Sequence, residues 1–333
     1  MDLKERTICL LFRQPGRFFS LERIFRQLEP LMEKSIRVTS WSAAHSAFTP
    51  GKLLSNILAA RKNRADVYHV TGDIHYVVLA LPRRRTLLTI HDCVFLYTAT
   101  GIKRKLLKWF LLDMPVRRCR LISTISEATK KDILQYTGCP PEKLVVIPDP
   151  VAGSIYYVPA VFNEQQPVIL FVGTTNNKNL LLTAAALKNI SCRVDIIGPL
   201  SAEQQQALED NHIHYQPYSG LTDEEMAARY AAADIVLFPS TFEGFGLPIV
   251  EGQKAGRPVI TSNLSPMKET AGNAACLVDP SDPASIREGV LKVIRDADYR
   301  QRLVGEGFRN ITRFSPEAIA KQYLECYEKI LNS

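Results

Sequence analysis

Short apolar runs alternate with amphipathic stretches from the start of the chain to residue 147. Near-continuous apolar runs of this length are typical of strands buried on both faces of a parallel sheet. The expected strands are Thr7–Phe12, Ile36–Trp41, Ala65–Val70, Thr86–Ile90, Arg120–Thr124 and Leu144–Ile147. Helical patterns separate several of them, at Ser20–Glu33, Lys52–Arg61, Lys103–Leu112 and Glu127–Tyr136. The alternation predicts a doubly wound α/β domain.

The pattern halts at Pro148-Asp149-Pro150, and a polar segment containing Pro and Gly follows as far as Pro167. We interpret this segment as a linker. The alternation then resumes, with strands expected at Val168–Val172, Arg193–Ile197, Ile213–Tyr215, Ile235–Pro239, Pro258–Thr261 and Ala274–Val278. Helices are expected at Lys178–Lys188, Ala202–Asp210, Asp223–Ala232 and Gly246–Ala255, with two or three more from Asp282 to Leu331. The chain is therefore predicted to contain two Rossmann-like domains, with ligands at the carboxyl ends of the strands beside the interdomain cleft.

Composition supports a folded, two-domain chain of 333 residues, 46% of them hydrophobic. No apolar run approaches the roughly 18 residues that a membrane-spanning helix needs. The charged start of the chain has too few apolar residues for a secretory signal, so a cytoplasmic location is predicted. The seven cysteines are scattered without a C-x-x-C pair, which argues against a disulfide framework and a structural zinc site.

Charge divides the chain into a basic and an acidic half. Residues 1–150 hold 25 Lys and Arg against 13 Asp and Glu, a balance of +12, whereas the remainder holds 16 against 21, a balance of −5. A basic half of this kind favours an anionic partner. Lys103–Arg120, with seven basic residues and Trp109, suits either contact with an anionic membrane or a core helix with a basic outer face. No nucleic-acid-binding module is recognisable, so nucleic acid is not an expected partner.

The most informative motif follows the strand that ends at Phe238. A glycine-containing loop leads into a helix that begins near Gly246, and such a helix start is suited to binding a phosphate. Glu243 precedes the helix and Glu251 lies within it, so two carboxylates flank the predicted anion site. An ordinary strand–loop–helix connection, with Glu243 only capping the helix, is the alternative.

This motif resembles the signature of the retaining nucleotide-sugar glycosyltransferases of family 4, which have the GT-B fold. The signature appears as Glu243-Gly-Phe-Gly-Leu-Pro-Ile-Val-Glu251, followed by Gly256-Arg-Pro258-Val259. Thr89-Ile-His91-Asp92 and the closing segment from Phe314 to Tyr323 are also similar to the family. The resemblance implies an acceptor-side domain at 1–152, a donor-binding domain at 153–315, and a final helix at about 316–333 that packs back on the first domain.

The resemblance also implies roles for individual residues. Glu243 and His91 would act at the transferred sugar, and Glu251 would bind the ribose hydroxyls. Lys178 would neutralise the departing diphosphate, although Thr174 stands where the family often has an arginine. The remaining donor-side residues are Gly173, Tyr218, Phe245, Gly246 and Leu247; those on the acceptor side are Gly16, Arg17 and Asp92.

The predicted function is therefore retaining transfer of a sugar from a nucleoside-diphosphate sugar, most naturally a UDP- or GDP-sugar, to a glycan or lipid-linked acceptor. Synthesis of a cell-surface polysaccharide is the expected context, with neither a metal ion nor a further cofactor. Peripheral contact with the inner face of an anionic membrane is an open possibility. Two alternatives remain at this point: a non-catalytic subunit that binds nucleotide sugars, and a GT-B-fold epimerase of the nucleotide sugar.

Overall fold

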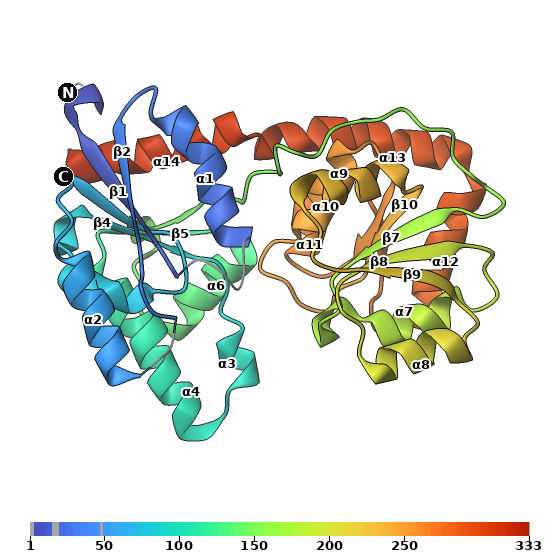
Figure 1. The fold of residues 1–333 in the computed structure, drawn as a ribbon, viewed down its shortest axis with the longest axis horizontal. Coiled ribbons are helices and arrows are strands. Elements are labelled where there is room, and N and C mark those ends of the chain that lie inside the picture. The colour runs from blue at the N-terminus through green and yellow to red at the C-terminus, as the bar shows by residue number, and fades with distance from the viewer. Residues whose placement is uncertain (1–2, 15–19, 47–48, 333) are drawn as a thin grey trace. The chain divides into compact units, whose positions relative to one another are not determined.

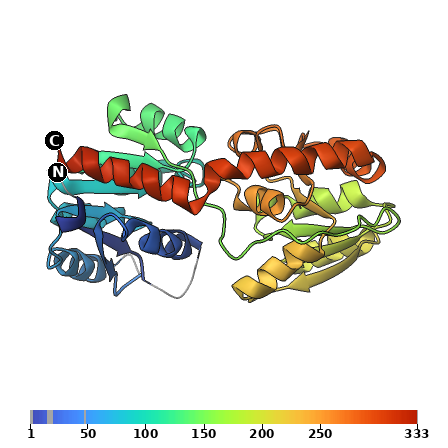
Figure 2. The same ribbon diagram turned by 90° about the horizontal axis from the view of Figure 1, so that it is seen from above.

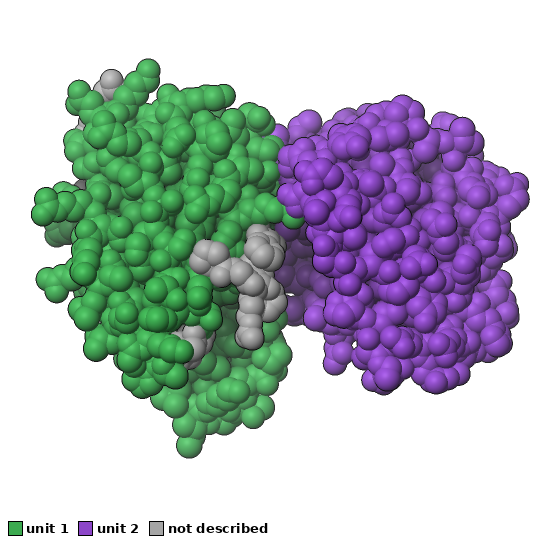
Figure 3. Space-filling model, viewed as in Figure 1, with its two compact units in different colours: residues 1–150, 316–333 green, residues 151–315 purple. Residues whose placement is uncertain are grey.

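The computed structural model describes residues 3–14, 20–46 and 49–332. The chain divides into two compact units, which Figures 1 and 3 show. Unit 1 comprises Met1–Pro150 and Pro316–Ser333, and unit 2 comprises Val151–Ser315. Each unit is built on a six-stranded sheet in which neighbouring strands pair in parallel. The predicted pair of doubly wound parallel sheets is thus confirmed.

The sheet of unit 1 has the strand order β2-β1-β3-β4-β5-β6. Its strands are β1 (Thr7–Phe12), β2 (Arg37–Ser42), β3 (Val67–Val70), β4 (Thr86–Ile90), β5 (Leu121–Thr124) and β6 (Leu144–Val146). Its helices are α1 (Ser20–Met32), α2 (Pro50–Ala60), α3 (Phe95–Thr98), α4 (Gly101–Lys108), α5 (Met114–Arg118), α6 (Glu127–Tyr136) and α14 (Pro316–Leu331). The central strands β3, β4 and β5 are buried along their whole length, whereas the edge strand β2 has no fully buried residue. Helices on both faces explain why the central strands are buried.

Helix α14 comes from the end of the chain and packs on unit 1 beside α1 (Figure 2). Phe25 of α1 lies with its ring centroid 5.4 Å from that of Tyr323 of α14. Tyr327, one turn further along α14, reaches the buried His69 of β3, with 2.8 Å between the hydroxyl oxygen and Nδ1. The terminal helix is therefore part of the core of unit 1.

The sheet of unit 2 has the order β12-β11-β10-β7-β8-β9. Its strands are β7 (Val168–Val172), β8 (Arg193–Ile197), β9 (His214–Tyr218), β10 (Ile235–Phe238), β11 (Val259–Ser262) and β12 (Cys276–Val278). Its helices are α7 (Leu180–Leu187), α8 (Ala202–Asp210), α9 (Asp223–Ala232), α10 (Leu247–Lys254), α11 (Met267–Ala271), α12 (Pro283–Arg295) and α13 (Ala297–Asn310). Strand β9 extends three residues beyond its predicted end, to Tyr218, because its polar residues pair along β8 at an exposed edge.

Local signals in the sequence set several helix starts. Ser201 and Thr222 form capping boxes at the beginnings of α8 and α9, and Ser126 caps α6 through the backbone N–H of Thr129. These side chains satisfy N–H groups that a helix start would otherwise leave unpaired. Among the described residues, no helix is both long and apolar enough to cross a bilayer.

Candidate functional site

In unit 2, the loops after β7 and β10 meet at the carboxyl edge of the sheet, because these two strands are neighbours. The ammonium of Lys178 lies 2.6 Å from Oε1 of Glu243, and both side chains are largely buried. The side-chain amide of Asn177 donates to the same carboxylate oxygen at 3.1 Å and to the carbonyl of Phe242 at 2.9 Å. A cation and a carboxylate are thus held side by side at this edge.

Lys178 is held from a second direction by the loop that carries it. Gly173 has a φ of +92°, and a Cβ there would lie 2.9 Å from Cε of Lys178. The lysine stem therefore lies across the glycine, in a backbone conformation that a side chain would strain. The ammonium also lies 4.7 Å from the ring centroid of Phe238. These contacts fix the position of the positive charge.

Helix α10 begins beside this pair. Gly246 takes a φ of +98° at the N-cap, and Pro248 stands in the first turn. The preceding residue, Phe245, is buried, and its carbonyl accepts a hydrogen bond of 2.8 Å from the Thr270 hydroxyl. Leu247 is the first helical residue. Because backbone N–H groups and the helix dipole give such a start positive character, it suits an anionic ligand.

Glu251 is oriented within α10 by a residue that the sequence prediction did not include. The hydroxyl of Tyr230, on α9, donates to Oε2 of Glu251 at 2.6 Å. Burial, and then the neighbouring carboxylate, raise the pKa of Tyr230 well above its usual value, so the phenol stays protonated as a donor. Asn177 was likewise missed. Neither contact has a signal in a single sequence, because each joins residues from different loops or helices.

Thr174 follows β7, and Tyr218 is the last residue of β9, on the other side of β8. The Thr174 hydroxyl donates to the carbonyl of Pro199 at 2.7 Å, so this side chain takes part in the turn. The Tyr218 hydroxyl accepts from Nη1 of Arg229 at 3.0 Å, and the guanidinium lies 4.8 Å from the tyrosine ring centroid. Arg229 is also 3.7 Å from a carboxylate oxygen of Asp195. Thr174 supplies no charge in place of the arginine that the family often has.

In unit 1, His91 follows β4 and is almost fully buried. Its Nε2 lies 2.8 Å from the carbonyl of Thr71 and so donates to it, which leaves Nδ1 without a proton in the neutral ring. Nδ1 faces a carboxylate oxygen of Asp149 at 3.9 Å. Burial raises the pKa of Asp149 to about 6, with the neighbouring His91 opposing part of that rise. Asp92 is exposed and accepts from the backbone N–H of Val94 at 3.0 Å.

The predicted acceptor-side residues Gly16 and Arg17 lie outside the described residues. Arg13, from the same loop, forms ion pairs with Glu22 at 2.7 Å and with Asp73 at 3.0 Å. In the described parts of the chain, no group of three or more His, Cys, Asp or Glu side chains is arranged to hold a metal ion. The structure thus brings Gly173, Lys178, Glu243 and Gly246 to one edge of unit 2, and it places His91 beside Asp149 in unit 1.

Two family models match the chain. Residues 166–296 match a family described as "Glycosyl transferases group 1", and residues 12–152 match "Glycosyltransferase Family 4". An O-antigen chain mannosyltransferase B of Escherichia coli is 28% identical over 300 residues, covering 81% of this chain and 76% of that protein. An MMP alpha-(1->4)-mannosyltransferase of Mycolicibacterium hassiacum is 27% identical, covering 96% of this chain and 84% of that protein.

Solved structures are similar along nearly the whole chain. A sucrose-phosphate synthase from Thermosynechococcus elongatus superimposes with a TM-score of 0.79 at 16% identity, covering 98% of this chain and 100% of the other. Anabaena HepE, in complex with UDP-glucose, gives a TM-score of 0.77 at 16% identity with the same coverage. At such low identity these likenesses establish the fold, which is GT-B.

Proposed function

Because the chain belongs to the group 1, family 4 glycosyltransferases, we propose that it moves a hexose from a nucleoside-diphosphate sugar to a hydroxyl of a glycan or lipid-linked acceptor, with retention of configuration. The observation that carries this proposal is the 2.6 Å contact between Lys178 and Glu243. It places a fixed cation and a carboxylate next to the start of α10. A diphosphate needs the cation as its partner, and the hydroxyls of a sugar need the carboxylate.

The proposed chemistry assigns the negative charge of the leaving diphosphate to Lys178 and the amino end of α10. Preorganised cations and helix dipoles contribute most where charge develops in the transition state. We propose that these groups, rather than a metal ion, stabilise the departing diphosphate. Glu251, oriented by Tyr230, binds the ribose hydroxyls.

Glu243 and His91 are assigned to the transferred sugar. One oxygen of Glu243 accepts hydrogen bonds from both Lys178 and Asn177, which suits a carboxylate that orients sugar hydroxyls better than a nucleophile. Retention would then follow from attack on the same face of the sugar, with a phosphate oxygen of the leaving group taking the acceptor proton. His91 acts from unit 1, in the role that the family resemblance gives it, and Asp92 lies next to it on the acceptor side.

We propose mannose as the transferred sugar and cell-surface polysaccharide as the product, because the relatives in Escherichia coli and Mycolicibacterium hassiacum are named as mannosyltransferases and the first acts on an O-antigen chain. The nucleotide is assigned to UDP or GDP. UDP is supported by the ligand of Anabaena HepE.

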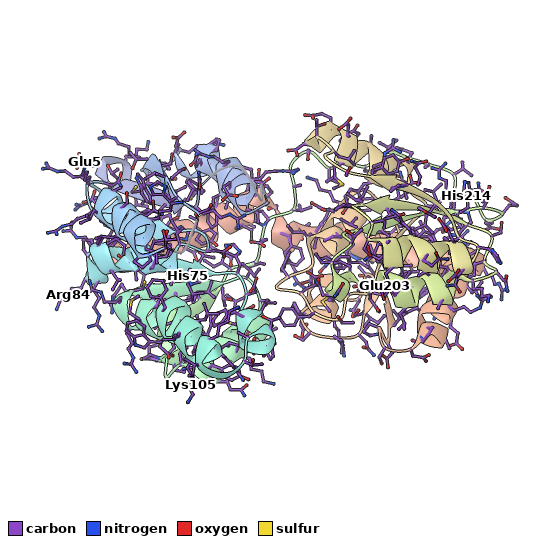
Figure 4. All side chains as sticks on the ribbon, turned by 60° about the horizontal axis from the view of Figure 1, so that its bottom comes forward. Glu5, His75, Arg84, Lys105, Glu203 and His214 are labelled. Atoms are coloured by element: carbon purple, nitrogen blue, oxygen red, sulfur yellow. The ribbon has the colours of Figure 1, made fainter. Side chains whose placement is uncertain are left out.

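A lipid-linked acceptor is supported by the surface of α4. This helix has no buried residue, and Ile102, Leu106 and the following Trp109 are 77%, 62% and 58% exposed. Basic side chains accompany them, including Lys105, which Figure 4 labels. An exposed apolar row among lysines and arginines suits a helix that lies on an anionic membrane. We therefore propose peripheral membrane contact through α4.

The test is transfer of labelled sugar from GDP-mannose, UDP-glucose and the remaining UDP- and GDP-hexoses to a lipid-linked glycan acceptor. The expected result is a glycosylated acceptor with one donor, unaffected by EDTA, and an α-linkage from an α-linked donor. Glu243→Ala should abolish most of this transfer while the protein still binds the nucleotide. Nucleotide binding without transfer would instead indicate a non-catalytic subunit, and release of an epimerised donor would indicate an epimerase.

A further inference from the structure

A large cavity lies in unit 1 at the amino ends of β4, β5 and β6. Its volume is about 650 Å³. His91 follows the carboxyl end of β4, whereas Arg83 and Arg84 stand in the turn just before its amino end, so the cavity opens at the opposite edge of the sheet. Six of its lining residues are cationic and one is acidic. They are Arg83, Arg84, Lys108, Arg117, Arg120, Lys143 and the acidic Asp113. We call this cavity the cationic pocket.

The positive charges of the cationic pocket are only partly balanced by carboxylates of the described residues. Lys108 is paired with Asp113 at 2.8 Å, which uses the only acidic side chain among the lining residues. In the part of the chain that the structure describes, no ion pair involves Arg83, Arg84 or Arg117. Like charges gathered in one concave surface repel each other, and a bound anion would remove that repulsion.

Lys143 is partly buried among these cations. Its ammonium donates to the carbonyl of Val116. Burial lowers the pKa of Lys143, and the positive charges of Arg83 and Arg120 lower it further. The charges of Arg83 and Arg120 thus act on Lys143, and the positive charges gathered here would together attract a phosphate.

The pocket is larger than one phosphate group requires. Tyr136 and the backbone around Gly138 line its wall and offer an aromatic face and polar groups beside the cations. A second cavity of about 420 Å³ shares Arg120 and Lys143 with it and adds Lys329 of α14 and the acidic Glu142. The cationic surface is thus long enough for two linked phosphates, with space for the group that carries them.

A cavity of unit 2 is lined by arginines whose hydrogen bonds are made within the protein, and it serves as a comparison for the cationic pocket. Its volume is about 440 Å³, and Arg257 and Arg300 line it. Arg257 donates to three backbone carbonyls, and Arg300 donates to two carbonyls and to Glu164. Both guanidinium groups are therefore satisfied by the fold. In the cationic pocket, Arg83, Arg84 and Arg117 form no ion pair with any residue that the structure describes.

We propose that the cationic pocket binds an anion that carries two or more phosphate groups, at a site separate from the edge of unit 2 assigned to the sugar donor. Arginine guanidinium groups bind phosphate oxygens through paired hydrogen bonds, and three of them here face one cavity. The diphosphate can be a free molecule or the headgroup of a lipid. Both sources present the same chemistry to the pocket.

The first experiment measures binding of inorganic pyrophosphate by calorimetry at physiological salt. The full chain carries Lys178→Ala, which removes the cation at the donor edge and isolates the pocket. Adding Arg83→Gln, Arg84→Gln and Arg117→Gln should weaken binding by roughly tenfold or more, because charge-assisted hydrogen bonds to phosphate are lost. These side chains are exposed, so the fold should persist.

A matched control removes the same charge from another surface of unit 1. Arg61, Lys62 and Arg64 are exposed, follow α2, and lie outside the cationic pocket. Changing all three to Gln should alter pyrophosphate affinity by less than about twofold, since screened charges at a distance contribute little. Equal loss in both triple variants, or no binding by the parent at millimolar pyrophosphate, would overturn the proposal.

The second experiment separates the two sources of phosphate. Phosphatidylcholine vesicles containing a prenyl diphosphate are compared with vesicles of the same surface charge that contain phosphatidylglycerol. Stronger binding to the diphosphate vesicles, lost in the pocket variant and competed by pyrophosphate, would assign the pocket to a lipid headgroup. Pyrophosphate binding without any preference between the vesicles would assign it to a free diphosphate. When the three pocket substitutions are made in the protein that keeps Lys178, nucleotide binding should be unchanged. Loss of pyrophosphate binding to the pocket can therefore be told apart from loss of nucleotide binding at the donor site.

Discussion

The two units are built on the same architecture but place their polar side chains differently. In unit 2, Lys178 and Glu243 lie in loops beyond the carboxyl ends of the strands. In unit 1, a connected group of polar side chains lies inside the sheet. His69, fully buried in β3, contacts the Thr89 hydroxyl at 2.7 Å through Nε2, and Thr89 contacts Ser123 of β5 at 2.6 Å.

Polar side chains therefore have two roles in the same fold. A polar group at the carboxyl edge remains available to a ligand, as in other doubly wound sheets. A polar group between strands is satisfied by the protein, and its hydrogen bonds link β3 and β4 to α14 through Tyr327. We therefore expect unit 1 to respond to pH mainly through stability, and unit 2 to respond to substitution mainly through ligand binding and turnover.

The largest expected effect is on the stability of unit 1 in acid. Burial lowers the pKa of His69 to about 3, with a smaller contribution from His91. The unfolded chain takes up a proton near pH 6.5 and the folded chain does not, so stability is lost as the pH falls from about 6.5 towards 3. The loss is up to about 5 kcal/mol, from the size of the shift.

Denaturant unfolding of the protein and of His69→Gln at pH 7, 5.5 and 4 tests this. The parent should be the more stable protein at pH 7, and its advantage should shrink as the pH falls. His214→Gln is the matched control, because His214 is exposed at the edge of unit 2 (Figure 4). This substitution should leave the unfolding free energy unchanged at all three pH values. A pH-independent difference between parent and His69→Gln would show that proton uptake by His69 does not limit stability.

The second effect isolates the chemistry of unit 2. Lys178→Ala should reduce turnover roughly 10²- to 10³-fold, as when one preorganised group that stabilises transition-state charge is removed. Unfolding free energy should also fall, because the largely buried carboxylate of Glu243 loses its charged partner. Lys188→Ala is the control, since Lys188 is an exposed lysine after the other end of α7. Normal transfer by Lys178→Ala would remove this residue from the proposed mechanism.

Sequence patterns predicted the strands of both units but not the contacts between distant residues. Lys178 and Glu243 are 65 residues apart, and they meet only because β7 lies next to β10 in the sheet order. The site in unit 2 was nevertheless recognisable, because Glu243 to Glu251 form a continuous motif. The roles assigned to these residues stay predictions.

The interior of unit 1 was less predictable for the same physical reason. His69 stands in an apolar run, and its partner Tyr327 is 258 residues away. Asp149 was read as part of a linker, whereas the structure buries its carboxylate beside His91. Burial of a charged group depends on how the sheet and its connections pack, and a local pattern of polar residues does not record this.

Asp149 gives a second pH effect in unit 1, opposite in direction to that of His69. Its pKa is raised to about 6 by burial, so the folded state holds this proton more tightly than the unfolded state does. Its contribution to stability is present below about pH 4 and is lost as the pH rises to about 6. Asp149→Asn should therefore gain up to about 3 kcal/mol of unfolding free energy at pH 7 relative to its value at pH 4, each measured against the parent. Asp92→Asn, at an exposed carboxylate, is the control, and the same pH trend in both variants would contradict the assignment.

The smallest effect concerns the hydrogen bond from Tyr230 to Glu251 in unit 2. Tyr230→Phe keeps the buried ring and removes the hydroxyl, so nucleotide affinity should fall roughly fivefold, about 1 kcal/mol for one hydrogen bond. Tyr156→Phe, at an exposed tyrosine, should leave affinity unchanged. In a Glu251→Gln background the effect of Tyr230→Phe should largely disappear, because the hydroxyl acts by orienting the carboxylate. If Tyr230→Phe lowers nucleotide affinity by the same factor in that background, Tyr230 contributes to binding independently of Glu251. That result is expected if polar groups of unit 2 also stabilise its interior, as those of unit 1 do.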